Sequence, residues 1–400
     1  MADNEISNVS MKEIQTVPVG SLGLVALDSC KAFGDKVDDY IVKWRAQKQS
    51  EHKDTIAFNG YERDSYILKS KISRFGSGEA KCTLYDSARG KDLYILVDVC
   101  NYSMTYKMFG QINHMSPDDH YADLKRVIEA VGGKAKRINV IMPFLYESRQ
   151  HKRDSRESLD CAVALQELMN MGVENIITFD AHDPRVANAV PLKGFETVQP
   201  TYQFIKALLK NEDDLRLDSD HLIVISPDVG GTGRAINFAN HLGLDVGMFY
   251  KRRDYSQVVD GRNPIVAHEY LGRDVKGLDI VVVDDMISSG ESMLEVAKAV
   301  KDRGARNVYI CATFGLFTSG LDMFDEYYKK GYITRVLTTN SIYQTPELLE
   351  RPYYINVDLS KYVALLIDNL NHDISISSLL DPTDRINNAV NNYKKAHGQA

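Results

Sequence analysis

The sequence predicts an α/β protein with two similar domains, each built on a mainly parallel sheet flanked by helices. Short apolar runs alternate with amphipathic helical patterns along nearly the whole chain. Continuous apolar runs of this kind are typical of strands buried on both faces of a parallel sheet. At 400 residues the chain is also longer than one ordinary hydrophobic core supports, so we expect two domains.

The predicted strands follow one another along most of the chain, and most of them end in polar or glycine residues. In order they read "DLYILVDV", "RINVIMPF", "NIITFDA", "HLIVISPD", "DVGMFYK", "DIVVVDD", "NVYICATF" and "ITRVLTTN". The stretches "ADLKRVIEAVGG", "SLDCAVALQELMNMG" and "ESMLEVAKAVKDRG" carry apolar residues three and four positions apart, which predicts amphipathic helices between the strands. A helix–turn–strand pattern at 134–148 recurs at 304–319, which indicates an internal duplication.

These elements define the predicted domain organisation. We place a partly helical N-terminal extension at 1–54, with its helix around "DKVDDYIVKWRAQKQ". A first domain follows at 55–195 and a second at 196–375, and a polar helical tail occupies 376–400.

Composition excludes several classes of function. A net charge of −7 argues against a nucleic-acid-binding or membrane-surface protein. No apolar run approaches the roughly 18 residues of a membrane span, and the polar, acidic N-terminus is no signal peptide. The five cysteines are scattered and form no CxxC pair, which is typical of reduced thiols. We therefore expect a cytoplasmic protein without a nucleic-acid or membrane partner.

The most informative segment is "IVVVDDMISSGESM", residues 280–293. An apolar strand ends on Asp284 and Asp285 and leads through a Ser- and Gly-rich loop into a helix. Ligands of open parallel sheets bind outside the carboxyl ends of the strands, and such a loop offers hydroxyls and backbone N–H groups to a phosphate. The two carboxylates suit sugar hydroxyls or hydrated Mg²⁺. The alternative, a strand end followed by an acidic helix cap, is common, and the bare pattern leaves both interpretations open.

A basic segment follows the strand "RINVIM". Within "SRQHKRDSR" lie five basic residues of an otherwise acidic protein, beginning with Arg149 and the adjacent Gln150. Arginine forks match phosphate oxygens, so this position at a strand end favours a nucleotide polyphosphate. The alternative is an exposed, solvated helix start.

Two further strand ends carry candidate metal or sugar ligands. "ITFDAHDP" places Asp180 and His182 on alternate residues, and hence on one side if the strand continues. An ordinary hydrogen-bonded Asp–His pair is the alternative. "VISPDVGGTGRA" combines Asp228 with Gly230 and Gly231, which permit close approach of the backbone to a ligand. It lacks the GxxxxGK[ST] pattern of a P-loop, so a Walker-type kinase is disfavoured.

The strand "MFYKRR" ends on basic residues, including Lys251 and Arg253, and a long polar segment follows. Cations on a mobile loop close over a transferring diphosphate in some enzymes and offset its charge. An exposed basic turn is the alternative.

These motifs, in this order, resemble a known family. "IVVVDDMISSGES" is similar to the type I phosphoribosyltransferase signature. The set of "RFGSGEAK", "SRQHKR", "DAH", "SPDVGG", "YKRR", "DDMISSGES" and "TTNSI" resembles the ribose-phosphate diphosphokinase family, also called phosphoribosyl diphosphate synthetases. The resemblance runs from about residue 74 to residue 340, and the first fifty residues have no counterpart in it. It implies two phosphoribosyltransferase-like domains, with ATP on the first and ribose 5-phosphate on the second. It also implies Mg²⁺ as cofactor and a homo-oligomer built from dimers, such as a hexamer.

The resemblance also implies a role for each site residue. The catalytic residues would be Lys251, Arg253 and His182. ATP would bind to Phe75, Ser77 and Glu79, reaching the base from a neighbouring subunit, and to Arg149, Gln150 and His182. Ribose 5-phosphate would bind to Asp228, Gly230, Gly231, Asp284, Asp285, Ser288, Ser289, Gly290 and Ser292. The metal ligands would be His182, Asp180 and Asp228.

Some positions depart from the family pattern. Ser288 stands where many members carry an acid, and Glu291 stands in the phosphate loop where they carry Gly. Glu291 repels a phosphate unless its side chain turns outward. Other interpretations are a non-catalytic regulatory homologue, a salvage or orotate-type phosphoribosyltransferase, and a nucleic-acid-binding module. The joint presence of the reactive residues argues against a non-catalytic homologue. The basic segment and the duplicated domain argue against a phosphoribosyltransferase, and the negative net charge argues against a nucleic-acid-binding module.

Overall fold

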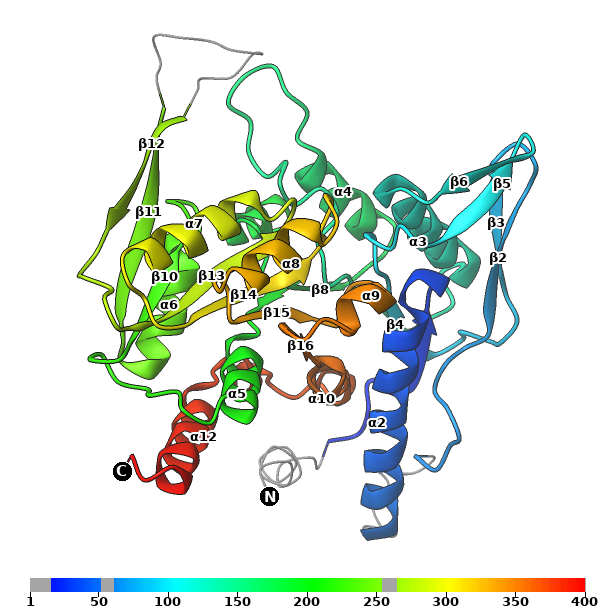
Figure 1. The fold of residues 1–400 in the computed structure, drawn as a ribbon. Helices are drawn as coiled ribbons and strands as arrows, with labels where there is room; N and C mark the ends of the chain where they lie inside the picture. The colour runs from blue at the N-terminus through cyan, green and yellow to red at the C-terminus, as the bar shows by residue number, and fades with distance from the viewer. Residues whose placement is uncertain (1–15, 52–60, 254–264, 400) are drawn as a thin grey trace. The chain divides into compact units, whose positions relative to one another are not determined.

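The computed structural model describes residues 16–51, 61–253 and 265–399, without the side chains of 51, 251–253 and 265–268. The chain divides into two compact units, each of which contains one large sheet (Figure 1). The first unit comprises Met1–Gln199, Asn340–Tyr343 and Asp358–Asp381. The second comprises Pro200–Thr339, Gln344–Val357 and Pro382–Ala400.

The first unit has a parallel five-stranded sheet in the order β1-β4-β7-β8-β9. Its strands are β1 (Ser21–Ala26), β4 (Lys91–Leu96), β7 (Arg137–Ile141), β8 (Asn175–Phe179) and β9 (Gly194–Val198). Its helices are α2 (Lys31–Glu51), α3 (Pro117–Val131), α4 (Asp160–Asn170), α10 (Ser360–Asn371) and α11 (Ser377–Leu380), with 3-10 turns η1 (Asp28–Cys30) and η3 (Pro184–Ala189). Two antiparallel hairpins accompany the sheet: β2 (Ser70–Arg74) with β3 (Ala80–Leu84), and β5 (Thr105–Met108) with β6 (Gln111–His114).

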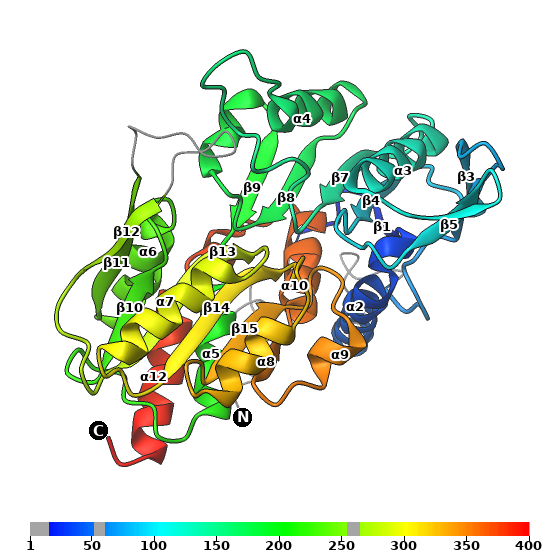
Figure 2. The ribbon, with the colours of Figure 1, turned by 45° about the horizontal axis from the view of Figure 1, so that its top comes forward.

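The second unit has a seven-stranded sheet in the order β12-β11-β10-β13-β14-β15-β16, parallel except at β12. Its strands are β10 (Leu222–Ser226), β11 (Asp245–Arg253), β12 (Ile265–Leu271), β13 (Asp279–Ile287), β14 (Val308–Gly315), β15 (Arg335–Thr339) and β16 (Tyr354–Val357). Its helices are α5 (Thr201–Asn211), α6 (Thr232–Leu242), α7 (Glu291–Asp302), α8 (Asp322–Lys329), α9 (Pro346–Leu349) and α12 (Thr383–Ala396). In Figure 2, α7 and α8 lie over one face of this sheet.

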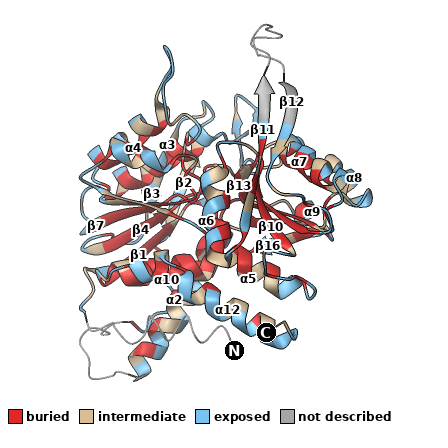
Figure 3. Cartoon of the chain, turned by 90° about the vertical axis from the view of Figure 1, so that its left-hand side faces the viewer, coloured by how far each residue is buried: buried red, intermediate tan, exposed pale blue. Residues whose placement is uncertain are grey.

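The strand interiors are the core, as their apolar runs predicted. All eight residues of β14 and the first five of β13 are buried, and Figure 3 shows the central strands as mostly buried. The eight predicted apolar runs coincide with β4, β7, β8, β10, β11, β13, β14 and β15. The three predicted amphipathic helices coincide with α3, α4 and α7. The predicted α/β class with mainly parallel sheets is confirmed.

The first fifty residues are more than an addition to the first domain. β1 lies within the predicted extension, yet it pairs in parallel with β4 as an edge strand of the first sheet. Helix α10, predicted in the second domain, counts with the first unit and packs against α2. Neither placement follows from the order of the elements along the chain, because β1 and α10 come to this unit from opposite ends of the sequence.

Candidate active site

In the second unit, β13 ends on a buried acidic pair. Asp285 is only 3% exposed, and its backbone N–H donates to Asp284 Oδ1 at 2.9 Å. Burial, together with the nearby Asp285 and Asp228, holds the pKa of Asp284 well above its usual range. The guanidinium of Arg234 lies 3.9 Å from Asp284 Oδ1 and 3.7 Å from Asp285 Oδ2. This strand end therefore concentrates carboxyl oxygens that a ligand's hydroxyls or a cation would stabilise.

The turn after β10 brings Asp228 to the same acidic pair. The Gly231 N–H donates to Asp228 Oδ1 at 3.0 Å, and the Ser226 hydroxyl donates to the Asp228 carbonyl at 2.6 Å. A Cβ at Gly231 would lie 2.9 Å from Ser226 Oγ and 3.3 Å from Asp284 Oδ1. A Cβ at Gly230 would lie 3.2 Å from Asp228 Oδ1. Because glycine has no side chain, Gly230 and Gly231 leave space open beside the carboxylates of Asp228 and Asp284.

The loop after β13 leads into α7 as expected of a phosphate loop. Gly290 is the N-cap of α7 with φ of 92°, a left-handed conformation that favours glycine, and a Cβ there would lie 2.4 Å from a ring atom of buried Phe324. Ser288, Ser289 and Ser292 are half-buried around this N-terminus. Glu291 is exposed in the first turn of α7, where its charge is compatible with the helix dipole.

The predicted catalytic cations lie on β11. This strand pairs antiparallel with β12, with Lys251 opposite His268 and a register shift between Arg252 and Arg253. The side chains of Lys251 and Arg253 lie outside the described residues, so their roles stay predictions.

In the first unit, the basic segment lies beside His182. The His151 ring is 5.3 Å from the His182 ring between centroids, and His151 Nε2 is 3.5 Å from Asp183 Oδ2. The Gln150 side-chain amide donates to the Ser158 carbonyl at 2.8 Å and so holds the loop's two ends together. Arg149, the residue before Gln150, is exposed. The structure therefore brings the predicted nucleotide segment and His182 together.

The condition under which Asp180 and His182 would share one side of the strand is not met. β8 ends at Phe179, and Asp180 has a positive φ of 39°, so the strand does not continue and does not place Asp180 and His182 on one side. Asp180 is buried, and its Oδ1 accepts from the Gln199 amide at 3.2 Å. Within the described ranges no cluster of three or more His, Cys, Asp or Glu side chains has the geometry to hold a metal ion.

The predicted base-binding residues form the tip of the β2–β3 hairpin. The Phe75 N–H donates to the Glu79 carbonyl at 2.7 Å, and the Ser77 hydroxyl donates to Glu79 Oε2 at 2.8 Å. Phe75 is 52% exposed, and Ser77 and Glu79 are exposed as well. One exposed turn thus carries an aromatic ring, a hydroxyl and a carboxylate.

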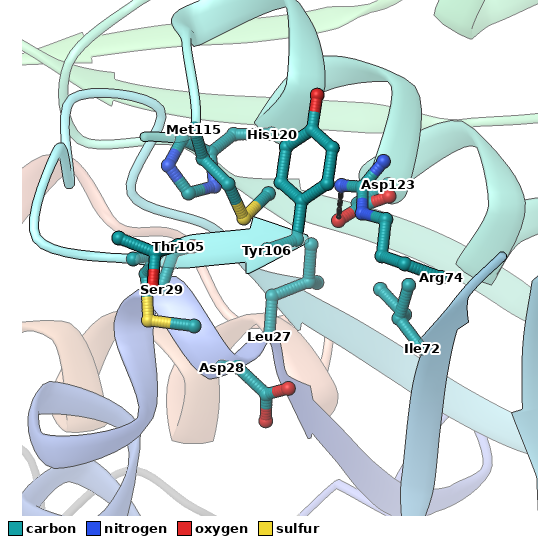
Figure 4. A pocket seen from close by; sticks show the side chains of 11 residues that line it. Leu27, Asp28, Ser29, Ile72, Arg74, Thr105, Tyr106, Met115, His120 and Asp123 are labelled. Atoms are coloured by element: carbon teal, nitrogen blue, oxygen red, sulfur yellow. Dashed lines mark hydrogen bonds and ion pairs between the residues drawn. The ribbon is translucent and has the colours of Figure 1, made fainter. Parts of the chain in front are cut away.

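The last residue of β2, next to this tip, is anchored to α3 beside a cavity of about 110 Å³ (Figure 4). Arg74 donates to Asp123 at 2.7 Å, and its guanidinium lies 4.6 Å from the centre of the Tyr106 ring. Since Arg74 directly precedes Phe75, these contacts fix the direction of the tip.

Comparison with known proteins identifies the family. Residues 22–172 match the N-terminal domain of ribose phosphate pyrophosphokinase, and residues 194–351 match the phosphoribosyl transferase domain. The chain belongs to the ribose-phosphate pyrophosphokinase family. The first match begins at residue 22, so the expectation that the first fifty residues have no counterpart in the family was wrong from that residue on: the match includes β1 after its first residue and all of α2.

The family's relatives cover most of the chain. A ribose-phosphate pyrophosphokinase of Vibrio parahaemolyticus is 28% identical over 316 residues, 78% of this chain and 91% of the relative. One from Vibrio vulnificus is 29% identical over 314 residues, 78% of this chain and 90% of the relative. The crystal structure of phosphoribosylpyrophosphate synthetase from Mycobacterium smegmatis covers 88% of this chain and 99% of its own, with a TM-score of 0.68 and 21% identity. The protein is thus an enzyme of the transferase class with this family's fold.

Two residues near the site were not singled out from the sequence. Arg234 sits in the first turn of α6, three residues after Gly231, and its spacing from Asp228 was the available signal. His151 was noted only as part of the basic segment, although its ring is 5.3 Å from that of His182. No helix in the described part of the chain has both the length and the apolar character needed to cross a bilayer.

Proposed function

We propose that the chain transfers the β,γ-diphosphoryl group of ATP to the 1-hydroxyl of ribose 5-phosphate, giving 5-phosphoribosyl 1-diphosphate and AMP. The observation that carries this proposal is the acidic end of β13 followed by the loop into α7, in a chain of the ribose-phosphate pyrophosphokinase family. It joins acceptors for sugar hydroxyls to donors for a phosphate within one strand–loop–helix segment.

On the sugar side, Asp284 and Asp285 accept hydrogen bonds from the ribose hydroxyls. The hydroxyls of Ser288, Ser289 and Ser292 and the backbone around Gly290 bind the 5-phosphate at the N-terminus of α7. Ribose hydroxyls bound there donate further hydrogen bonds to the carboxyl groups, and these offset the burial and the neighbouring negative charges that raise the pKa of Asp284. Asp228, Gly230 and Gly231 line the same position.

On the nucleotide side, Arg149, Gln150 and His182 bind the polyphosphate, and Phe75, Ser77 and Glu79 bind the base. The sugar's 1-oxygen attacks the β-phosphorus and loses its proton. The bond from the β-phosphorus to the oxygen it shares with the α-phosphorus breaks, and AMP leaves with that oxygen. Lys251 and Arg253 stabilise the charge on the transferring group. Such a reaction relies on positioning and electrostatics more than on covalent work by the protein.

The residues of the second unit fit Mg²⁺, which supplies charge neutralisation at phosphate oxygens when bound. Mg²⁺ prefers carboxylate and water oxygens, and burial together with the nearby Asp285 and Asp228 raises the pKa of Asp284, which marks a carboxyl-rich site that a cation would stabilise. Asp228 would hold it there. His182 and Asp180 would hold it on the nucleotide side, although the Gln199 amide already occupies one Asp180 oxygen.

We also place the protein in the cytoplasm and expect a dimer-based homo-oligomer, such as a hexamer. Five free cysteines support a reducing compartment, and the exposed base-binding tip suits a subunit contact.

The experiment that tests the function is product analysis with ATP, Mg²⁺ and ribose 5-phosphate. We expect AMP, not ADP, and only when the sugar phosphate is present. A regulatory homologue would bind ligands without forming AMP. A phosphoribosyltransferase would instead consume 5-phosphoribosyl 1-diphosphate in the presence of a nucleobase, and either result would overturn the proposal.

A further inference from the structure

The turn of the β5–β6 hairpin holds an aromatic residue in an unfavourable conformation. Phe109 and Gly110 form a two-residue loop between Met108 and Gln111, with φ of 49° and 79°. Hairpin loops with positive φ at both central residues favour Asn-Gly, because Asn tolerates the left-handed region and a bulky side chain is strained there. A phenylalanine in this strained backbone conformation points to a function at that position.

The side chain of Phe109 is not buried. It is 82% exposed, the second most exposed of the large hydrophobic residues in the described chain, after Leu192 at 95%. The ring therefore neither packs in a core nor suits its turn, and both observations call for a partner outside the folded unit.

The tip of this hairpin is joined to the tip that carries the predicted base-binding residues. The Phe109 N–H donates to the Gly76 carbonyl at 2.8 Å, next to Phe75. Gly78 packs so closely on the second hairpin that a Cβ there would lie 2.7 Å from Met108 Sδ. Figure 1 shows the two hairpins side by side. Phe75 and Phe109 are thus exposed on one composite tip.

A second set of contacts, made by Arg74 at the tip end of β2, also joins the two hairpins (Figure 4). The Arg74 guanidinium stacks over Tyr106 of β5 at 4.6 Å, and the Tyr106 hydroxyl donates to Asp119 of α3 at 3.3 Å. Arg74 also donates to Asp123 of α3 at 2.7 Å. The contacts of Arg74, Gly76 and Gly78 thus hold the tip end of the first hairpin against the second hairpin, so the spacing of Phe75 and Phe109 is set before any ligand binds.

We propose that Phe109 contacts the nucleobase together with Phe75, so that the tip of the joined hairpins is a two-aromatic base-binding surface. This inference rests on the proposed function, which assigns the base to Phe75, and it adds a residue from a separate hairpin. Phe75 is 52% exposed and Phe109 is 82% exposed, so both rings are accessible to a base. The Ser77 hydroxyl and the Glu79 carboxylate beside them supply polar partners for the base edge.

The test measures how much the base adds to affinity. The probes are α,β-methylene-ATP, which cannot undergo the transfer, and inorganic tripolyphosphate, which lacks base and sugar. We expect Phe109→Asn to weaken binding of the nucleotide about tenfold, since stacking of one base on an aromatic residue changes affinity roughly 5- to 160-fold. Binding of tripolyphosphate should stay unchanged. Phe109→Trp should retain nucleotide affinity. Asn suits the turn, so the variant should fold with an unchanged or higher melting temperature.

Ile112→Thr is the matched control, because Ile112 is a 68% exposed apolar residue of the same hairpin beyond its turn, and its affinities should not change. The proposal is overturned if Phe109→Asn binds the nucleotide within twofold of wild type, or if it weakens both probes equally. A fall in assembly mass by light scattering that accompanies the loss would also overturn it, since Phe109 would then act through a second copy. Because binding is measured without catalysis, a failed activity assay leaves this test intact.

Discussion

Asp368 is predicted to be the most stability-sensitive carboxylate of the first unit. It lies in α10 and accepts from Arg45 Nε at 2.8 Å and from Lys48 Nζ at 2.6 Å, both in α2. The side chains of Asp368, Arg45 and Lys48 are only 2%, 1% and 6% exposed. Asn371 Oδ1 accepts a further hydrogen bond from Arg45 at 2.7 Å. One carboxylate thus compensates two cations that are shielded from water.

Asp368→Asn keeps the volume and removes the charge. Breaking a buried ion pair by removal of one partner costs about 3–5 kcal/mol, because the remaining charge stays buried and uncompensated. With two cations affected, we expect the upper part of that range. Burial alone raises the pKa of Asp368, but Arg45 and Lys48 outweigh it and lower the pKa. The stabilisation is therefore present above the ordinary pKa of an aspartate and is lost as the pH falls through the lowered value.

The assay is urea unfolding followed by circular dichroism, with Asp35→Asn as control. Asp35 pairs with Lys31 at 2.8 Å on the same helix α2, but these side chains are 47% and 67% exposed, so the control should lose no more than about 0.5 kcal/mol. Asp368→Asn should lower the midpoint of its transition by about 1–2 M urea. A loss within about 1 kcal/mol of the control would refute the reasoning that burial makes this pair decisive.

Three further predictions concern the sugar site and the buried histidine. Gly231→Ala places a methyl group 2.9 Å from Ser226 Oγ and 3.3 Å from Asp284 Oδ1. The KM for ribose 5-phosphate should therefore rise roughly tenfold, and overpacking should lower the stability by about 1–3 kcal/mol; an unchanged KM would count against a sugar site there. Arg234→Met removes the cation 3.7 Å from Asp285, so sugar-phosphate affinity should fall and Arg234→Lys should restore part of it, whereas equal affinities in both variants would exclude an electrostatic role. Burial lowers the pKa of His372 from 6.5 to about 4, so between these pH values the unfolded state binds a proton that the folded state does not. The free energy of unfolding should therefore fall by about 3 kcal/mol as the pH drops through this window. Unfolding at pH 7, 5.5 and 4 should show a smaller fall in His372→Asn than in the wild type, and equal falls in both proteins would contradict the assignment.

Much of the fold was readable from the sequence because its strands are continuous apolar runs. In β13, for example, five buried residues precede the two acids, and a short β-branched apolar run of this kind is typical of a strand buried in a parallel sheet. The loop into α7 was equally clear, since Gly290 needs its positive φ and the helical apolar spacing resumes directly after it.

The elements that the sequence did not predict are those that depend on distant partners. β1 has an ordinary short apolar run, and only its pairing with β4, some seventy positions away, makes it part of the sheet. The β5–β6 hairpin was missed because its turn is Phe-Gly rather than Asn-Gly and its strands have few buried residues. Arg234 and His151 belong to the site through contacts across turns, which spacing alone does not show.

The central claim concerns which phosphorus atoms move, and ³¹P NMR of the reaction follows them directly. With ATP, Mg²⁺ and ribose 5-phosphate, we predict that the β- and γ-phosphorus signals of ATP disappear together and reappear as a diphosphate on the sugar's first carbon, while the α-phosphorus remains in AMP. Lys251→Ala should abolish the change without preventing nucleotide binding. Transfer of the γ-phosphorus alone, with ADP as product, or spectra that stay unchanged in the presence of both bound ligands, would contradict the account.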